Sequence, residues 1–198
     1  MHRRGAYAKT PLRQLRIVLI AKEMFAAHGY WGTSLTAVAR AADLSSTGVT
    51  HHFPSKDMLM MAVLDHASSS LLPAVDAGST GLRASMSELA RRACADPSSA
   101  RLVLMLEAEA CSADHPAHRW FQHWRRTLRS SARQWALADP TLRLNQTEAE
   151  VLGLQVVATC EGLLLHWLAD GDFDVVQAVD AAVATLAAGA RVCDTSSV

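Results

Sequence analysis

Three breaks in the helical pattern, at residue 29, residues 43–46 and residue 54, constrain the first quarter of this chain more than any other feature. From about Thr10 to His28, apolar residues recur at steps of three and four, at Leu12, Leu15, Val18, Leu19, Met24 and Phe25. This spacing predicts an amphipathic helix. Gly29 follows immediately and is placed to end that helix as a left-handed C-terminal cap.

Two short helices are predicted between the remaining breaks. Thr33 or Ser34 can cap the first of them. The second runs roughly over residues 46–52, because Pro54 pushes the preceding residue out of the α region. Asp43, in the turn between them, can tolerate a left-handed backbone, though less easily than glycine. Three short helices with a four-residue turn before the third describe a helix-turn-helix.

Beyond Ser55, which is placed to cap the next helix, the pattern is helical throughout. Breaks imply helices near 57–72, 81–94, 98–112, 117–137, 147–169 and 173–191. The predicted fold class is all-α with about nine helices. An N-terminal helix-turn-helix domain at 10–56 is joined by the helix at 57–72 to a C-terminal helical bundle at 73–198.

The formal net charge is zero, but the charges are segregated. Residues 1–56 carry eight cations and two anions, a net charge of +6, and the remainder carries eleven cations and seventeen anions. A basic N-terminal quarter indicates one segment that faces an anionic partner. Chance clustering on a solvated face is the alternative on charge alone.

Other protein classes are disfavoured. The four cysteines are far apart and lack CxxC spacing, which argues against a zinc ribbon or a redox dithiol. No glycine-rich phosphate loop, nucleophile–base motif or paired-carboxylate signature is present, so we expect neither an enzyme nor a cofactor. The apolar stretch 151–169 contains Gln155, Glu161 and His166, which argues against a membrane span. We expect a soluble cytoplasmic protein with free thiols and no signal peptide.

The last two predicted helices are apolar on most sides, so most sides must be buried. In a domain of this size, a second subunit is expected to cover one side, and a purely intramolecular core is the alternative. The candidate interface residues are Val151, Leu154, Leu164, Leu165, Leu168, Val179 and Val183.

Residues 16–64, "RIVLIAKEMFAAHGYWGTSLTAVARAADLSSTGVTHHFPSKDMLMMAVL", resemble the N-terminal DNA-binding domain of the TetR family of transcriptional regulators. The motif elements are Phe-x-x-x-Gly-Tyr at 25–30, Thr-Ser at 33–34, an apolar-Ala pair at 38–39, and His-Phe-x-Ser-Lys at 52–56. The sequence departs from the family's pattern at Asp43 and Thr47, where glycine is usual, and at Thr50, where an aromatic is usual. The wording around the third helix is close to a "TGLLHHFPSK" subset.

The resemblance implies an obligate homodimer whose last two helices form the interface. It also implies a C-terminal domain that binds an unidentified small-molecule effector, and recognition helices that enter a pseudo-palindromic double-stranded DNA operator. We expect a ligand-responsive repressor. An activator of the same fold, or a helical protein-interaction module without DNA binding, is the alternative.

The candidate DNA-binding residues follow from this placement. Hydroxyls and backbone N–H groups at the starts of the second and third helices can contact phosphates, and short hydroxyls discriminate bases weakly. For Ser34 and Thr36, simple N-capping is a compatible second role. The set is Ser34, Thr36, Ser45, Ser46, Thr47, Gly48, Thr50, His51, His52 and Lys56. A weaker candidate is an arm of Arg3, Arg4, Lys9 and Arg13.

The adjacent histidines can be interpreted in two ways. As a metal pair they fit poorly, because neighbouring helical residues do not face each other. As phosphate contacts they fit, because an imidazole N–H can donate to a phosphate. For His52, packing beside Phe53 is the alternative. Lys56 heads the fourth helix, where its charge and the helix N-terminus can share a phosphate.

In the C-terminal domain, an effector pocket is predicted from Met105, Glu109, Trp120, Trp124, Cys160 and Trp167. Apolar residues at helical spacing are more often plain core, which is the competing interpretation. Nearby His, Cys and Glu residues between 107 and 123 are irregularly spaced across Pro116, so we expect no metal site there.

Overall fold

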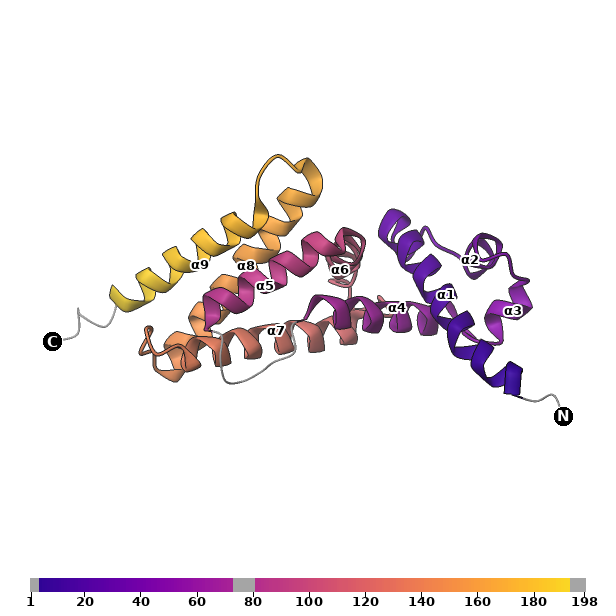
Figure 1. Cartoon of the computed structure of the whole chain (residues 1–198), viewed down its shortest axis with the longest axis horizontal. Helices are drawn as coiled ribbons and strands as arrows, with labels where there is room; N and C mark the ends of the chain where they lie inside the picture. The colour runs from indigo at the N-terminus through magenta and orange to yellow at the C-terminus, as the bar shows by residue number, and fades with distance from the viewer. Residues whose placement is uncertain (1–3, 73–80, 193–198) are drawn as a thin grey trace. The chain divides into compact units, whose positions relative to one another are not determined.

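The computed structural model describes residues 4–72 and 81–192, and side chains within 11–72 and 81–190. All regular structure in these ranges is α-helical (Figure 1). The helices are α1 (Arg4–His28), α2 (Leu35–Ala41), α3 (Ser46–Thr50), α4 (Lys56–Leu71), α5 (Leu82–Ala95), α6 (Pro97–Glu109), α7 (His118–Ala138), α8 (Gln146–Asp170) and α9 (Val175–Val192). The prediction of an all-α fold with about nine helices is confirmed.

The chain forms two compact units. The N-terminal unit comprises residues 1–70 and 98–121, and the C-terminal unit comprises residues 71–97 and 122–198. This division differs from the predicted one into 10–56 and 73–198, because α6 and the α6–α7 loop cluster with the first helices. A helix near the middle of the chain therefore belongs to the unit that carries the helix-turn-helix.

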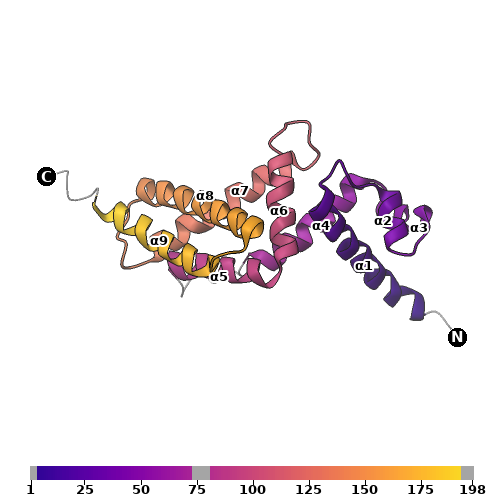
Figure 2. The ribbon, with the colours of Figure 1, turned by 90° about the horizontal axis from the view of Figure 1, so that it is seen from above.

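Local capping sets the path of α1, α2 and α3 (Figure 2). Gly29 has φ +67° and its N–H bonds the carbonyl of Phe25 at 2.9 Å, which confirms the predicted left-handed cap. Ser34 caps α2 by accepting from the Ala37 N–H at 3.1 Å. Asp43 has φ +57° in the turn before α3, as predicted. These bonds form the helix-turn-helix from contacts between near neighbours in the sequence.

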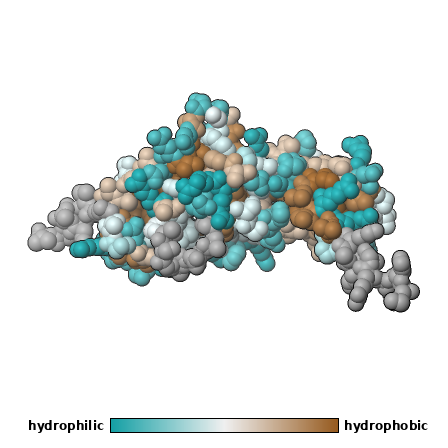
Figure 3. Space-filling model, viewed as in Figure 1, coloured by the Kyte–Doolittle hydropathy of each residue, from teal (hydrophilic) through white to brown (hydrophobic). Residues whose placement is uncertain are grey.

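The buried side of α1 includes only part of the predicted apolar set, namely Val18 and Phe25. Ile17, Ala21 and Phe25 are fully buried, whereas Leu12, Leu15 and Leu19 are 69%, 43% and 40% exposed. The helix carries apolar residues on two sides, so the periodicity alone could not decide which side faces the core. Figure 3 shows hydrophobic surface over the N-terminal helices.

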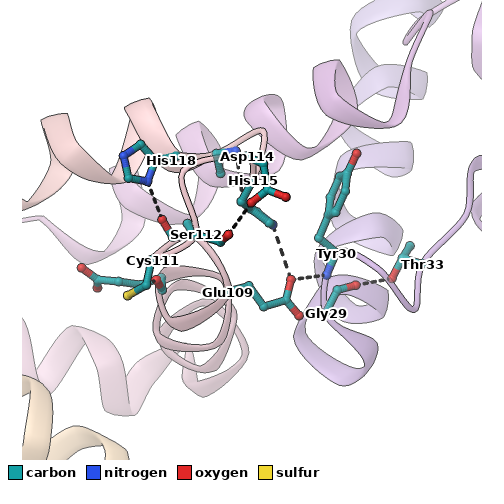
Figure 4. Close-up of polar contacts among 12 residues, drawn as sticks. Gly29, Tyr30, Thr33, Glu109, Cys111, Ser112, Asp114, His115 and His118 are labelled. Atoms are coloured by element: carbon teal, nitrogen blue, oxygen red, sulfur yellow. Dashed lines mark hydrogen bonds and ion pairs between the residues drawn. The ribbon is translucent and has the colours of Figure 1, made fainter.

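The chain turns sharply at residues 29–33, which we call the α1 corner (Figure 4). The Glu109 carboxylate, at the end of α6, accepts from the Tyr30 N–H at 2.9 Å. A Cβ atom added to Gly29 would lie 2.0 Å from an oxygen of this carboxylate, so only glycine fits both the backbone conformation and the contact. The Thr33 hydroxyl donates to the carbonyl of Gly29 at 2.9 Å. A residue 79 positions away thus holds the backbone of the corner.

His115 buttresses the same corner from the α6–α7 loop. Its ring is buried, and its Nδ1 accepts from the Ala117 N–H at 3.1 Å. The proton of a neutral ring therefore lies on Nε2, which faces the Glu109 carboxylate at 3.5 Å without a hydrogen-bond partner. The ring packs edge-on against Tyr30, with 5.0 Å between centroids. The loop therefore contacts the corner in two ways, through the approach of His115 Nε2 to the Glu109 carboxylate and through the packing of the ring on Tyr30.

In the C-terminal unit, α8 and α9 pack on each other and both contact α5. Asn145 and Glu148 form a reciprocal capping box at the start of α8, and Gly171, with φ +67°, ends the helix. A Cβ atom on Gly153 would lie 3.1 Å from the Arg133 backbone nitrogen, so this glycine permits α7 and α8 to approach closely. Leu164, Val179 and Val183 lie in the core of this unit.

These burials correct part of the predicted dimer interface. Leu164, Val179 and Val183 are buried within one chain, so they cannot contribute surface to a second one. Val151, Leu154 and Leu165 are 51%, 49% and 58% exposed on one side of α8, and Leu168 is half-buried. Among the described helices, α8 is long and apolar enough to cross a membrane by length and composition alone, yet only 33% of that stretch is buried. An exposed apolar face therefore remains on α8.

We predict that Asp43→Gly stabilises the protein. Aspartate at φ +57° bears a steric cost that glycine avoids, and its removal should raise the free energy of unfolding by roughly 0.5–1 kcal/mol. Asp43→Val should lower it, because a β-branched residue tolerates this conformation poorly. Urea denaturation followed by circular dichroism measures both, and a destabilised Asp43→Gly variant would contradict the account.

We predict that Glu109→Ala is strongly destabilising and Glu109→Gln only mildly so. Alanine leaves the N–H of the buried Tyr30 without its acceptor, at a cost of about 1–3 kcal/mol. Glutamine retains an acceptor oxygen and serves as the matched control. The same denaturation experiment compares the two, and equal losses would show that the hydrogen bond to the corner is not what Glu109 supplies.

Candidate DNA-binding interface

The third helix presents a polar outer side on an apolar anchor. Ser45 caps α3 by accepting from the Gly48 N–H at 3.0 Å. Val49 is fully buried and Phe53 is 8% exposed, so these two side chains fix the helix to the N-terminal unit. The outward side consists of Ser46, Thr47, Thr50 and His51, all exposed. α3 therefore offers hydroxyls and one imidazole to a partner.

The start of α2 contributes to the same unit. Ser34 and Thr36 are both exposed, and Ser34 uses its Oγ as the cap of α2. Capping leaves the hydroxyl proton of Ser34 available to a phosphate oxygen, because Oγ acts only as acceptor in that bond. Thr33, the other predicted cap, is instead buried and donates to the α1 corner. Of the two predicted donors at the start of α2, Ser34 also caps the helix, whereas Thr36 has no such role.

The cap of α3 explains why residue 48 is a glycine. It is half-buried, and a Cβ atom there would lie 3.2 Å from the Ser45 Oγ that caps the helix. A side chain would therefore press on the cap. The Thr50 hydroxyl donates to the carbonyl of Thr47 at 3.3 Å, so its methyl group is the part that is left for an apolar contact.

The two histidines correct one expectation. Their rings lie edge to face with 5.3 Å between centroids, although neighbouring helical side chains were expected to diverge. The reason is that α3 ends at Thr50, two residues earlier than predicted, so His52 has left the helix. Partial burial, the neighbouring His51 and the charge of Arg13 lower the pKa of His52 below its ordinary value of 6.5. The free protein therefore favours the neutral form of His52, and a neutral imidazole can still donate one N–H to a phosphate.

Lys56 is engaged inside the N-terminal unit. Its ammonium donates to the carbonyls of Tyr30 and Thr33, both at 3.0 Å, and lies 3.9 Å from the centroid of the Tyr30 ring. Two of its three N–H donors thus hold the α1 corner. The predicted phosphate contact stays a prediction, with one donor remaining for it.

Among the described side chains of the N-terminal quarter, one cation does not reach the surface. Lys22 is 7% exposed and donates to Ser99 at 3.4 Å, so it cannot face a partner. Arg13, Arg16 and Arg40 are exposed. Arg16 and Arg40 were not among the predicted contacts, and only their exposure identifies them. For the predicted arm, Arg3 and the side chains of Arg4 and Lys9 lie outside the described residues.

The six predicted effector-pocket residues are divided between the two units. Met105, Glu109 and Trp120 belong to the N-terminal unit, and Trp124, Cys160 and Trp167 belong to the C-terminal unit. Glu109 holds the α1 corner, and the Trp120 Nε1–H donates to Asp65 at 2.9 Å. Cys160 is buried, and burial together with the charge of Glu161 raises the pKa of its thiol to about 12. Within the described residues, no group of three His, Cys, Asp or Glu side chains is arranged to hold a metal ion.

Comparison with known proteins agrees with this geometry. Residues 17–63 match the sequence model described as "Bacterial regulatory proteins, tetR family". Solved structures of similar fold include a TetR-family transcriptional regulator from Streptomyces coelicolor (TM-score 0.68, 19% identity, 90% of this chain and 80% of that one). Two others are GusR of Salmonella enterica (0.64, 21%, 90% and 93%) and TylP, a TetR regulator of Streptomyces fradiae (0.62, 22%, 93% and 87%). The chain has the TetR fold. No curated protein matches it.

The match to the sequence model at residues 17–63 covers the helix-turn-helix formed by α2 and α3. The family model spans α2 and α3 entirely, and it ends within α4. Identities of 19–22% with the solved structures establish the fold alone, so the residues that contact DNA rest on the geometry described above.

We predict that His52 titrates below pH 6.5 and that Arg13→Gln raises its pKa, because that variant removes a nearby positive charge. Arg16→Gln is the control, since its charge is not among the causes of the shift. The folded state favours neutral His52, so this residue stabilises the fold above pH 6.5 and the contribution is lost as the pH falls. NMR titration of the ring measures both, and a His52 pKa above 6.5 would contradict the account.

Proposed function

We propose that this protein is a DNA-binding transcriptional regulator, a ligand-responsive repressor in the cytoplasm that binds a pseudo-palindromic operator as a homodimer. The observation that supports this most is the α3 surface. Ser46, Thr47, Thr50 and His51 are exposed on a short helix that buried Val49 fixes in place, inside a match to the TetR-family domain. In a helix-turn-helix, the exposed side of the second helix is the surface that enters the major groove.

The contacts proposed for DNA are mostly hydrogen bonds rather than ion pairs. Ser34, Thr36, Ser45, Ser46 and Thr47 would position the two helix starts on phosphates, with Gly48, Thr50, His51, His52 and the remaining donor of Lys56 beside them. Arg13, Arg16 and Arg40 would supply the exposed charge. A modest number of cations predicts a shallow dependence of affinity on salt compared with strongly basic DNA-binding domains.

The exposed apolar side of α8 supports the proposed homodimer, because a second subunit would cover it. A two-fold dimer would place two copies of α3 in successive major grooves, about 34 Å apart. We propose that an effector shifts the population toward a spacing of the two helices that no longer fits the operator. The predicted effector residues are divided between the two units, so this step rests on the resemblance to the family.

The direct test begins with selection from a pool of random DNA duplexes. The selected sites should contain two related half-sites about one helical turn apart. Binding of one such site is then measured by fluorescence anisotropy for the natural protein and for Thr47→Ala. A lost hydrogen bond of about 1 kcal/mol counts twice in a dimer, so affinity should fall roughly thirtyfold.

Ser69→Ala is the matched control, because this exposed hydroxyl on α4 bonds only the carbonyl of His66 within its own helix. Its affinity should equal that of the natural protein. A pool that yields no enriched site would favour a protein-interaction module and contradict the proposed function. An effector that tightens operator binding would keep DNA binding but reverse the proposed induction.

A further inference from the structure

A basic groove lies between α7 and α8 in the C-terminal unit. Arg126, Arg129 and Arg133 of α7 line one side, and Thr147, Val151 and Leu154 of α8 line the other, around a cavity of about 700 Å³. The three arginines lie at steps of three and four and therefore share one face of α7. Val151 and Leu154 are exposed, so the groove combines charge with apolar surface.

The charge of this groove has little compensation within the chain. Arg129 donates to the carbonyl of Arg125 at 3.3 Å and Arg133 donates to the side chain of Gln146 at 3.2 Å. Among the described residues, none of the three lining arginines forms an ion pair with a carboxylate, although Glu150 lines the same groove. α7 itself contains no Asp or Glu, so neighbouring arginines repel one another along it. A counter-charge from outside the chain would relieve this repulsion.

Acidic residues lie at both ends of α8, with Glu148 and Glu150 near its start and Asp170 and Asp172 where it ends. Between Arg143 and Arg191 the sequence contains seven acidic residues and no Lys or Arg. Asp170 and Asp172 are exposed where α8 ends. Asp170 lies at the negative end of the helix dipole, and the last turn contains no basic residue to offset it. The local environment therefore does not stabilise the negative charge of these carboxylates.

The exposed apolar side of α8 connects the two charged ends. Val151, Leu154 and Leu165 lie along it, and between them a Cβ atom on Gly162 would meet nothing within 4 Å. The distance from residue 151 to residue 169 is about 27 Å along the helix axis. One face of one helix thus runs from an arginine groove to an acidic loop.

We propose that a second copy of this chain packs antiparallel on this face, so that Asp170 and Asp172 of the partner subunit enter the arginine groove. The inference rests on the proposed homodimer and adds which charges lock it and in which direction. A two-fold axis across the middle of α8 makes the contact occur twice, because each end of the face then meets the opposite end. A parallel pairing would bring arginines beside arginines and aspartates beside aspartates, which the charge pattern opposes.

The apolar face supplies the area of contact, and the charges set its direction. Arginine can bind a carboxylate with two parallel hydrogen bonds, which adds geometric specificity to the attraction. Such pairs at the rim of an interface act mainly on partner selection and on salt dependence. Dimerisation should therefore weaken as salt rises, in spite of the apolar core of the contact.

Charge reversal tests the lock in the full-length chain. Arg126→Glu with Arg129→Glu, and Asp170→Arg with Asp172→Arg, are two double variants, and each should raise the dimer dissociation constant at least about tenfold in sedimentation equilibrium. An equimolar mixture of the two should associate more tightly than either variant alone. The chain with all four substitutions should recover a homodimer. Arg119→Glu, an exposed charge on α7 outside the groove, is the control and should change nothing.

The outcomes separate this inference from the proposed function. A natural chain that stays monomeric would refute the homodimer and this lock together. A natural chain that dimerises while both double variants dimerise equally well would refute the lock and leave the homodimer standing. Weakening by the arginine variant alone, without rescue in the mixture, would assign the groove to a different anion and overturn the inference. If a reversed variant fails to fold, the Gln and Asn versions at the same positions are compared by their salt dependence, which should be flatter than that of the natural chain.

Discussion

The hydrogen bond from the Tyr30 N–H to the Glu109 carboxylate is the contact on which the N-terminal unit depends. It holds the chain where α1 ends, and Gly29 has no side chain to obstruct it. Lys56 binds the carbonyls of the same corner, and the Tyr30 hydroxyl donates to Asp57 at the start of α4. Burial and this bond raise the pKa of Tyr30 to about 12, so the contact persists across the physiological range. The corner thereby sets the directions from which α2 and α4 begin.

In the N-terminal unit, some cations bind groups of the protein itself and others are exposed. Lys22 and Lys56 bind groups within their own unit, whereas Arg13, Arg16 and Arg40 face outward. The exposed side of α3 itself is polar, with Ser46, Thr47, Thr50 and His51. In the C-terminal unit, Arg83 pairs with Asp180 and Arg92 pairs with Glu88, whereas the arginines of the groove between α7 and α8 form no ion pair among the described residues. Charge that is unpaired in one chain is available to an operator or to a second copy.

Local features of the sequence predicted the helix-turn-helix well. The left-handed residues Gly29 and Asp43 and the cap at Ser34 depend on near neighbours, which a sequence displays directly. The same is true of Ser55, whose Oγ accepts from the Met58 N–H at the start of α4. The all-α class followed from spacing over longer segments, where the periodic signal accumulates.

The sequence could not predict the long-range contacts, and the reason is physical. Glu109 reaches Tyr30 over 79 positions and was assigned to an effector pocket, because nothing near it in the chain indicates an acceptor for a distant N–H. Leu12 and Leu15 have the spacing of a core face and are exposed, since α1 is apolar on two sides. Core residues and interface residues are both apolar, so the sequence could not tell which of these Val179 and Val183 are. Only the packing shows that they are buried within one chain.

Amide hydrogen exchange with and without an operator duplex tests the central claim that α3 is the DNA-contacting surface. Protection should increase over residues 45–52 and at the start of α2, while α5 should exchange as before. The outward N–H groups of these helix starts would be shielded by phosphates. Unchanged exchange over residues 45–52, with new protection elsewhere in the chain, would contradict the account.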